Sequence, residues 1–343
     1  MTAKPLIIDY AAFDLSRAEP ELMTMNADII ALQRTRGGPW DKPIEAVRQA
    51  RREGRGTFPT VAVDADAGMI EIEGRSGQAV PVRIYRPSAR TAQGTFLHFH
   101  GGGWVWGAAE ENDPFLRLIA EQTGLAVASV DYRLAPEFPF PLGPEDCEDA
   151  ALALLAGRMA DDAGPLPTGF LAIGGESAGA HLAVLTLLRL RYRHGVTPFG
   201  AANLNAGCFD LSLTPSVRRF GPERLVLNTE DIEAFAERFV PAGMDRRSPD
   251  VSPLYADLGG LPPALFTCGT CDPLVDDSLF MASRWQAATG AAELSLVPGG
   301  CHMFQNMPSS VGLRSMGEMA GFLRRHQTEQ AGLRGGERLV EQF

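Results

Sequence analysis

The stretch FLAIGGESAGAHLAVLTLL, residues 170–188, passes from a short apolar run through a glycine-rich turn into a helical pattern. Its centre, GESAG at residues 175–179, matches G-x-S-x-G, a motif in which a serine sits on a sharp turn between a strand and a helix. The outer glycines let neighbouring backbone pass close to the turn, and the start of the helix favours negative charge near Ser177. A lone match can also be an ordinary glycine-rich corner with an incidental serine. Other residues of the chain are therefore needed to distinguish a catalytic serine from this alternative.

Short apolar runs alternate with helical stretches on both sides of this turn. Apolar residues alternate by twos in VPVRIYRP (80–87), and helical periodicity returns in segments such as NDPFLRLIAEQTG (112–124). This alternation predicts an α/β fold with a mostly parallel central sheet flanked by helices on both faces. The other predicted strands are GTFLHFH (94–100), AVASVDYR (126–133), FLAIGG (170–175), AANLNAG (201–207), ALFTCG (264–269) and AELSLVPG (292–299).

Two segments depart from the alternation, and we expect them to form a helical cap. Residues 1–58 contain helix and turn patterns only, and residues 206–254 form a polar, proline-punctuated insertion with one clear helix, NTEDIEAFAERFV (228–240). An insertion of this size after a strand often covers an active site. The catalytic α/β domain is then expected to comprise residues 59–205 and 255–343.

A serine that transfers an acyl group needs a base, an acid that orients the base, and donors for an oxyanion. In the fold that carries this turn, the acid and the base follow the serine in that order, each on a loop after a strand. Asp272 and His302 each follow a predicted strand, so the parallel sheet brings both to the same edge as Ser177. Asp276 and Asp277 are rival acids, but we expect them inside the next helix, in an N-cap or surface role.

The stretch HFHGGGWVWG, residues 98–107, ends a predicted strand in three consecutive glycines. Because glycine has no Cβ, its N–H can approach an oxyanion where a side chain would collide, and such segments supply donors upstream of a catalytic serine. Gly102 and Gly103 are therefore the predicted donors, together with the N–H of Ala178. The residues expected to support this loop are His100 and Gly101.

Four further residues are candidates for the substrate pocket. Trp104 and Trp106 follow the glycines, and the sequence leaves two roles open for them: pocket wall, or packing of the cap onto the body. Glu176 directly precedes the nucleophile. Met303 follows the predicted base, where its bulky side chain would narrow the pocket.

The composition restricts the classes of partner. A formal net charge of −11 argues against nucleic acid and against an anionic membrane surface. The N-terminus lacks the features of a signal peptide, no run approaches the ~18 apolar residues of a membrane-spanning helix, and five scattered cysteines fit a reducing cytoplasm. Cys268 and Cys271 form a CxxC without the further ligands of a zinc site, so we expect ordinary buried cysteines there and no metal.

These motifs together resemble the bacterial hormone-sensitive lipase family of carboxylesterases, a group with the α/β-hydrolase fold. The residues that carry the resemblance are HGGG (100–103), DYRLAPEFPFP (131–141), GESAG (175–179), DPL (272–274) and His302. The resemblance implies a two-part cap over the pocket, short acyl esters as substrates and no cofactor. The chain departs from the family at Glu176, where many members carry aspartate, and at Met303, where glycine is common.

We therefore expect a serine carboxylesterase that hydrolyses short- to medium-chain acyl esters through an acyl-enzyme intermediate. A small-molecule ester is the expected partner. Two alternatives stay open: a non-catalytic ligand-binding protein on the same fold, and an amidase or lactonase that uses the same residues. A homodimer is also open, because the sequence does not fix the oligomeric state.

Overall fold

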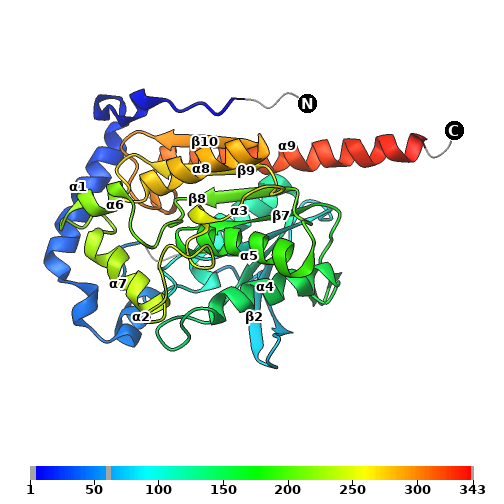
Figure 1. The fold of residues 1–343 in the computed structure, drawn as a ribbon, viewed down its shortest axis with the longest axis horizontal. Helices are drawn as coiled ribbons and strands as arrows, with labels where there is room; N and C mark the ends of the chain where they lie inside the picture. Colours follow the sequence, from blue (N-terminus) through cyan, green and yellow to red (C-terminus); the bar gives the residue numbers. More distant parts are fainter. Residues whose placement is uncertain (1–4, 59–62, 341–343) are drawn as a thin grey trace.

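An eight-stranded sheet with helices on both faces is the centre of the computed structural model (Figure 1). The structure describes residues 5–58 and 63–340, with side chains described as far as Leu333. The predicted start of the catalytic domain at residue 59 and its last three residues lie outside this part of the chain, as do residues 1–4 of the predicted cap.

The strands follow the order β1-β2-β4-β3-β7-β8-β9-β10. β2 runs antiparallel to both of its neighbours, and every pair from β4 to β10 is parallel, so the predicted α/β fold is confirmed. All predicted strands are present, whereas β1 was not predicted because most of its side chains are exposed. The strands are β1 (Gly68–Glu73), β2 (Ala79–Tyr85), β3 (Thr95–Phe99), β4 (Ala126–Val130), β7 (Leu171–Glu176), β8 (Ala201–Asn205), β9 (Ala264–Gly269), β10 (Ala292–Val297) and a separate pair, β5 (Ala160–Asp161) with β6 (Gly164–Pro165).

Helices bury both faces of the sheet, as a parallel sheet requires. Adjacent residues of β3 point to opposite faces: Leu97 packs into the core on one side and Phe96 into the core on the other. The first core contains side chains of α4 (Leu142–Leu155), α5 (Ala178–His194) and α8 (Val275–Thr289). The second contains side chains of α3 (Asp113–Thr123) and α9 (Ser310–Val340).

The expected N-cap or surface role of Asp277 is wrong. Asp277 is fully buried in α8, where it accepts hydrogen bonds from the N–H groups of Phe209 (2.6 Å) and Asp210 (2.9 Å) and from the Thr214 hydroxyl (2.7 Å). Burial raises the pKa of Asp277 to about 7, because a desolvated carboxylate is costly. The contacts tie the start of the 206–254 insertion to the body of the molecule.

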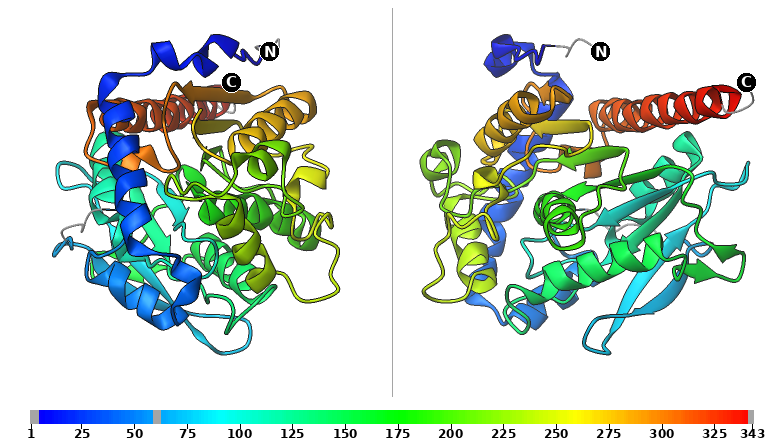
Figure 2. Two further views of the ribbon diagram at one scale, coloured as in Figure 1. Left: turned by 90° about the vertical axis from the view of Figure 1, so that its left-hand side faces the viewer. Right: turned by 45° about the vertical axis from the view of Figure 1, so that its right-hand side comes forward.

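Four helices lie together beyond the carboxyl ends of the parallel strands (Figures 1 and 2). They are α1 (Pro20–Arg36), α2 (Ile44–Arg52), α6 (Pro215–Phe220) and α7 (Thr229–Phe239). Asn228 caps α7 through a capping box with Asp231. Trp40, between α1 and α2, stacks on Trp106 at 4.8 Å between ring centroids and donates from Nε1 to Asp231 (2.9 Å). The N-terminal segment and the insertion therefore meet above the strand ends.

Candidate active site

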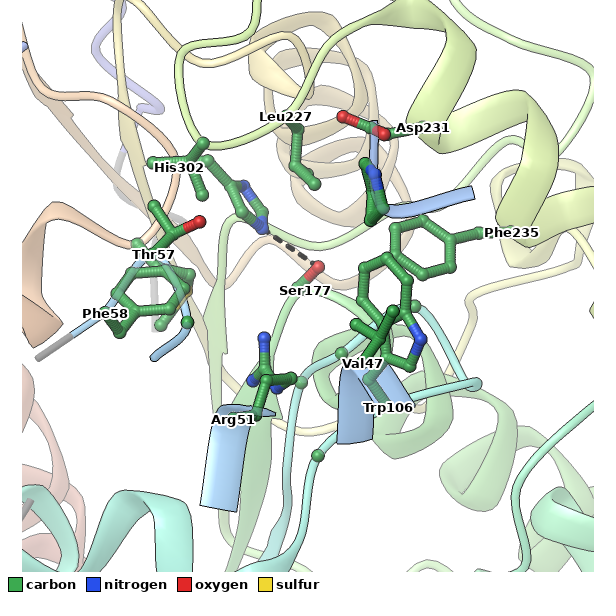
Figure 3. Close-up of a pocket in the computed structure, with 18 of the residues that line it drawn as sticks. Val47, Arg51, Thr57, Phe58, Trp106, Ser177, Leu227, Asp231, Phe235 and His302 are labelled. Carbon is green, nitrogen blue, oxygen red and sulfur yellow. Dashed lines mark hydrogen bonds between the residues drawn. The ribbon is translucent and has the colours of Figure 1, made fainter. Parts of the chain in front are cut away.

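Three predicted residues meet at the carboxyl edge of the sheet. Ser177 follows β7, Asp272 follows β9 and His302 follows β10. His302 Nε2 lies 3.0 Å from Ser177 Oγ (Figure 3). His302 Nδ1 lies 2.8 Å from Asp272 Oδ2. All three side chains are buried. The distances form a continuous hydrogen-bonded chain from carboxylate to hydroxyl, which is the geometry that an activated serine nucleophile needs.

The turn around Ser177 is strained and very tightly packed. Ser177 has φ 55° and ψ −118°, a conformation that non-glycine residues rarely adopt. A Cβ on Gly179 would lie 1.8 Å from the carbonyl oxygen of Phe99 at the end of β3, and one on Gly175 would lie 2.2 Å from the same atom. Both glycines of the motif are therefore required by the close approach of β3.

The glycine loop after β3 presents free backbone donors beside the serine. Gly101 donates its N–H to Glu176 Oε1 at 2.7 Å and is therefore engaged. Among the described residues, none accepts a hydrogen bond from the N–H of Gly102, Gly103 or Ala178. These three are the predicted oxyanion donors, and all three line the same cavity as Ser177.

Glu176 holds this loop in place from below. Besides Gly101, its carboxylate accepts a hydrogen bond from Asn112 Nδ2 (2.9 Å) and lies 2.8 Å from Nε2 of the buried His98. Three segments distant in sequence are thus joined at one side chain. The sequence placed Glu176 in the substrate pocket, and the structure adds this supporting role.

His100 supports the loop from its other side. Its Nδ1 donates to the carbonyl of Gly101 (2.8 Å), and its ring stacks on Tyr132 at 4.3 Å. Tyr132 in turn donates its hydroxyl hydrogen to the His100 carbonyl (2.8 Å). The DYRLAPEFPFP segment therefore braces the glycine loop without contributing a group to the reacting centre.

Trp104 and Trp106 lie between the cavity and the insertion. Each lines the cavity, and each also packs against the insertion: Trp104 stacks on Phe239 at 4.6 Å, and Trp106 contacts Phe235 edge to face at 4.7 Å. Trp104 Nε1 donates to Nδ1 of His181 (3.1 Å). Burial lowers the pKa of His181 to about 4, so this histidine is neutral and its Nδ1 can accept.

The cavity above Ser177 has a volume of about 210 Å³. Met303 lines it, as expected from its place beside His302. Sequence reasoning missed several lining residues because they come from the cap segments, whose docking depends on contacts between distant residues. They include Val47, Arg51, Phe58, Leu227 and Phe235 (Figure 3).

None of the five cysteines belongs to the hydrogen-bonded chain from Asp272 to Ser177, although Cys208 lines the cavity. All five are free, and burial raises the pKa of Cys301 to about 12, so the thiol beside His302 stays protonated. The described residues contain no cluster of three or more histidine, cysteine, aspartate or glutamate side chains able to hold a metal ion. Over the same residues, no helix has the length and apolar character needed to cross a membrane.

Comparison with known proteins identifies the family. The family model of the alpha/beta hydrolase fold matches residues 96–306, which is more than half of the chain. This range includes Ser177, Asp272 and His302. The chain belongs to the α/β-hydrolase family. Within it, the chain is 34% identical over 294 residues to the carboxylic ester hydrolase LipN of Mycobacterium tuberculosis, covering 83% of this chain and 77% of that protein.

Two further relatives place this α/β-hydrolase among the esterases. It is 30% identical to an ethyl acetate hydrolase of Pseudomonas putida, with 84% of this chain and 94% of that protein covered. A solved esterase of the bacterial hormone-sensitive lipase family has a TM-score of 0.76 and 29% identity over 90% of this chain and 99% of that one. This α/β-hydrolase is therefore a carboxylic ester hydrolase similar to the hormone-sensitive lipase family, and the resemblance noted in the sequence is confirmed.

Proposed function

We propose that the chain hydrolyses short- to medium-chain acyl esters through an acyl-enzyme formed on Ser177. The observation that carries the proposal is the hydrogen-bonded chain from Asp272 through His302 to Ser177, which ends in a cavity beneath the cap helices. A buried serine in this arrangement has both a base within reach and space for a substrate carbonyl.

Each residue has a distinct role in the proposed reaction. Ser177 Oγ attacks the ester carbonyl while His302 Nε2 takes its proton, and the same proton then goes to the leaving alcohol. Asp272 keeps the other ring nitrogen protonated and stabilises the imidazolium without becoming protonated itself. A water molecule, activated by His302, then hydrolyses the acyl-enzyme and restores the serine.

The N–H groups of Gly102, Gly103 and Ala178 stabilise the oxyanion of each tetrahedral intermediate. Their freedom from other partners among the described residues, and the firm support of the loop by Glu176 and His100, favour this role. Donors that are already oriented need no reorganisation when charge develops on the substrate oxygen.

Residues 1–58 and 206–254 form the proposed cap. Trp40 contacts both Trp106 and the α7 helix, so the two segments close over the cavity as one layer. A cavity of about 210 Å³ is smaller than the roughly 300–1,000 Å³ of pockets for drug-sized ligands, which favours small acyl groups. The name of the Pseudomonas putida relative, an ethyl acetate hydrolase, agrees with a small ester.

Covalent labelling tests the proposed nucleophile. Diethyl p-nitrophenyl phosphate should phosphorylate Ser177 as the serine oxygen displaces p-nitrophenolate. Only one equivalent of p-nitrophenol should be released, because water hydrolyses the resulting phosphoryl-serine slowly. Mass spectrometry of the digested protein should locate the diethylphosphoryl group on the peptide that contains Ser177. Loss of p-nitrophenyl acetate hydrolysis should parallel labelling; full activity after complete labelling elsewhere would contradict the assignment.

Gly102→Ala should lower kcat for p-nitrophenyl acetate by about 10²–10³-fold. Gly102 has φ 116°, and an added Cβ would lie 2.2 Å from the carbonyl oxygen of Trp106, so the loop has to shift and the N–H loses its direction. Steady-state kinetics should show the loss mainly in kcat, since the donors act on the transition state.

Gly77→Ala is the matched control for this change. Gly77 also has a positive φ, 77°, but an added Cβ there meets nothing within 4 Å, and it lies in the turn between β1 and β2. This variant should keep kcat within about twofold while losing some stability from the strain of a side chain at positive φ. Equal losses of kcat in the two variants would argue against an oxyanion role for Gly102.

A further inference from the structure

The charge around the catalytic cavity is opposite in sign to the charge of the whole chain. The protein has a formal net charge of −11, yet among the residues that the structure describes, five cationic and three anionic side chains line the cavity. The cationic residues are Arg36, Lys42, Arg51, Arg55 and Arg224, and the anionic residues are Glu111, Glu176 and Asp231. Because the whole chain is acidic, the excess of positive charge around the cavity does not follow from the overall composition and is specific to this site.

The anionic side chains of the lining are already engaged. Arg224 forms two hydrogen bonds with Asp231, at 2.6 Å and 2.8 Å. Glu176 is buried beneath the loop, where it accepts from Gly101 and Asn112. The charge of Asp231 is therefore offset by Arg224, whereas Glu176 keeps its charge but lies buried beneath the loop, away from the mouth of the cavity.

Arg36 and Lys42 carry the uncompensated charge. Neither forms an ion pair within the described part of the chain; Arg36 donates to the Gly56 carbonyl at 2.6 Å, and Lys42 donates to the Arg36 carbonyl at 3.3 Å. Both are exposed to solvent and line the cavity, so they lie at its mouth. Arg55 is similarly exposed, and its partner, Glu53, does not line the cavity.

Arg51 extends the positive charge inward. It projects from α2 toward the part of the cavity that holds Ser177 (Figure 3). Nε and Nη2 donate to Glu111, at 3.5 Å and 2.5 Å, which fixes the orientation of the guanidinium. Nη1 has no partner among the described residues, and its hydrogens are available to a ligand in the cavity.

We propose that this esterase prefers substrates that carry a carboxylate several bonds from the scissile ester, such as monoesters of dicarboxylic acids. The mouth formed by Arg36, Lys42 and Arg55 attracts the carboxylate, and Arg51 orients it. The inference rests on the proposed function of Ser177, because it names the substrate class of the same site. Hydrolysis of the monoester anion would consume one water and release an alcohol, a dicarboxylate dianion and a proton.

Three ethyl esters of nearly equal size but different charge provide the test. They are monoethyl adipate, its neutral primary-amide analogue ethyl 6-amino-6-oxohexanoate, and the cationic ethyl 6-aminohexanoate. At pH 8 and about 20 mM salt, kcat/KM should fall in that order, with the anion preferred over the neutral ester by about 5- to 30-fold. At about 500 mM salt the preference should shrink to within about threefold, because screening shortens the reach of exposed charges.

Single substitutions on the cap distinguish an effect of the cationic residues at the cavity mouth from an effect of the protein's net charge. Arg36→Gln and Lys42→Gln should each lower kcat/KM for monoethyl adipate by about three- to tenfold and leave the neutral ester unchanged within about twofold. Arg52→Gln is the matched control, because it removes the same charge from the exposed end of α2. Arg52 pairs with Glu45 and does not line the cavity. Its effect on all three esters should be small.

The outcomes of this test are distinct from those of the proposed function. Equal kcat/KM for the anionic and neutral esters at low salt, or equal effects of Arg36→Gln and Arg52→Gln, would overturn the substrate preference and leave the esterase mechanism intact. An enzyme without activity on any of the three esters and on p-nitrophenyl acetate would overturn both.

Discussion

Ser177→Ala is expected to lower kcat for p-nitrophenyl acetate by about 10⁵-fold, since the nucleophile is lost and only the oxyanion donors and binding remain. Water would have to attack the ester directly, from a position that the alanine methyl group partly occupies. The residual rate should still exceed the uncatalysed rate, because the N–H groups of Gly102, Gly103 and Ala178 are unchanged. Stopped-flow and long-time assays on protein purified apart from any host esterase measure the loss.

The fold should survive this substitution. Alanine keeps the Cβ of serine, so the strain at φ 55° is the same, and the lost contact is the hydrogen bond from Oγ to His302. Thermal unfolding of the variant should therefore stay close to that of the parent. A variant that keeps more than about one hundredth of the parent activity, with a normal unfolding midpoint, would show that another residue is the nucleophile.

That Ser177, Asp272 and His302 lie together could be predicted from sequence, because strand order in a parallel sheet determines which loops share an edge. Ser177 and His302 are 125 residues apart, yet each lies in a loop that follows a strand of the parallel sheet, and strand ends of one direction meet at one edge. The order of the motifs and strands along the chain is enough to predict that these residues lie together. The glycines were predictable for a similar reason, since only a residue without a Cβ fits where two backbones nearly touch.

The residues that were missed depend on how distant segments dock. Asp277 shows this most clearly, because its burial follows from the insertion folding back so that Phe209 and Asp210 donate to it. Local sequence indicates only an acidic residue in the first turn of a helix, which is ordinarily a surface feature. The supporting role of Glu176 likewise requires Asn112, and the place of Arg51 in the cavity requires α2 to lie over Ser177. No periodicity or motif encodes these contacts.

Asp272→Asn should lower kcat by about 10³–10⁴-fold at neutral pH while leaving the fold in place. Asp272 Oδ1 accepts from the Leu274 N–H at 2.9 Å, and Oδ2 lies 2.8 Å from His302 Nδ1. In the variant, the Leu274 N–H still needs an acceptor, so the amide oxygen takes that place and the NH₂ group faces His302. Nδ1 must then accept a hydrogen bond, which moves the ring proton to Nε2, where it points at Ser177 and blocks removal of the serine proton.

Asp276→Asn is the matched control, because Asp276 lies four residues further along the chain and is the partly exposed rival acid. It accepts from the Ser216 N–H at 2.7 Å and does not contact His302, and an amide oxygen can make the same bond. Its kcat should stay within about twofold of the parent value. If the two variants lose activity equally, the acid that orients His302 is not Asp272 alone. If only Asp272→Asn loses activity, and its loss lies in kcat with KM little changed, the defect is in proton transfer and not in substrate binding.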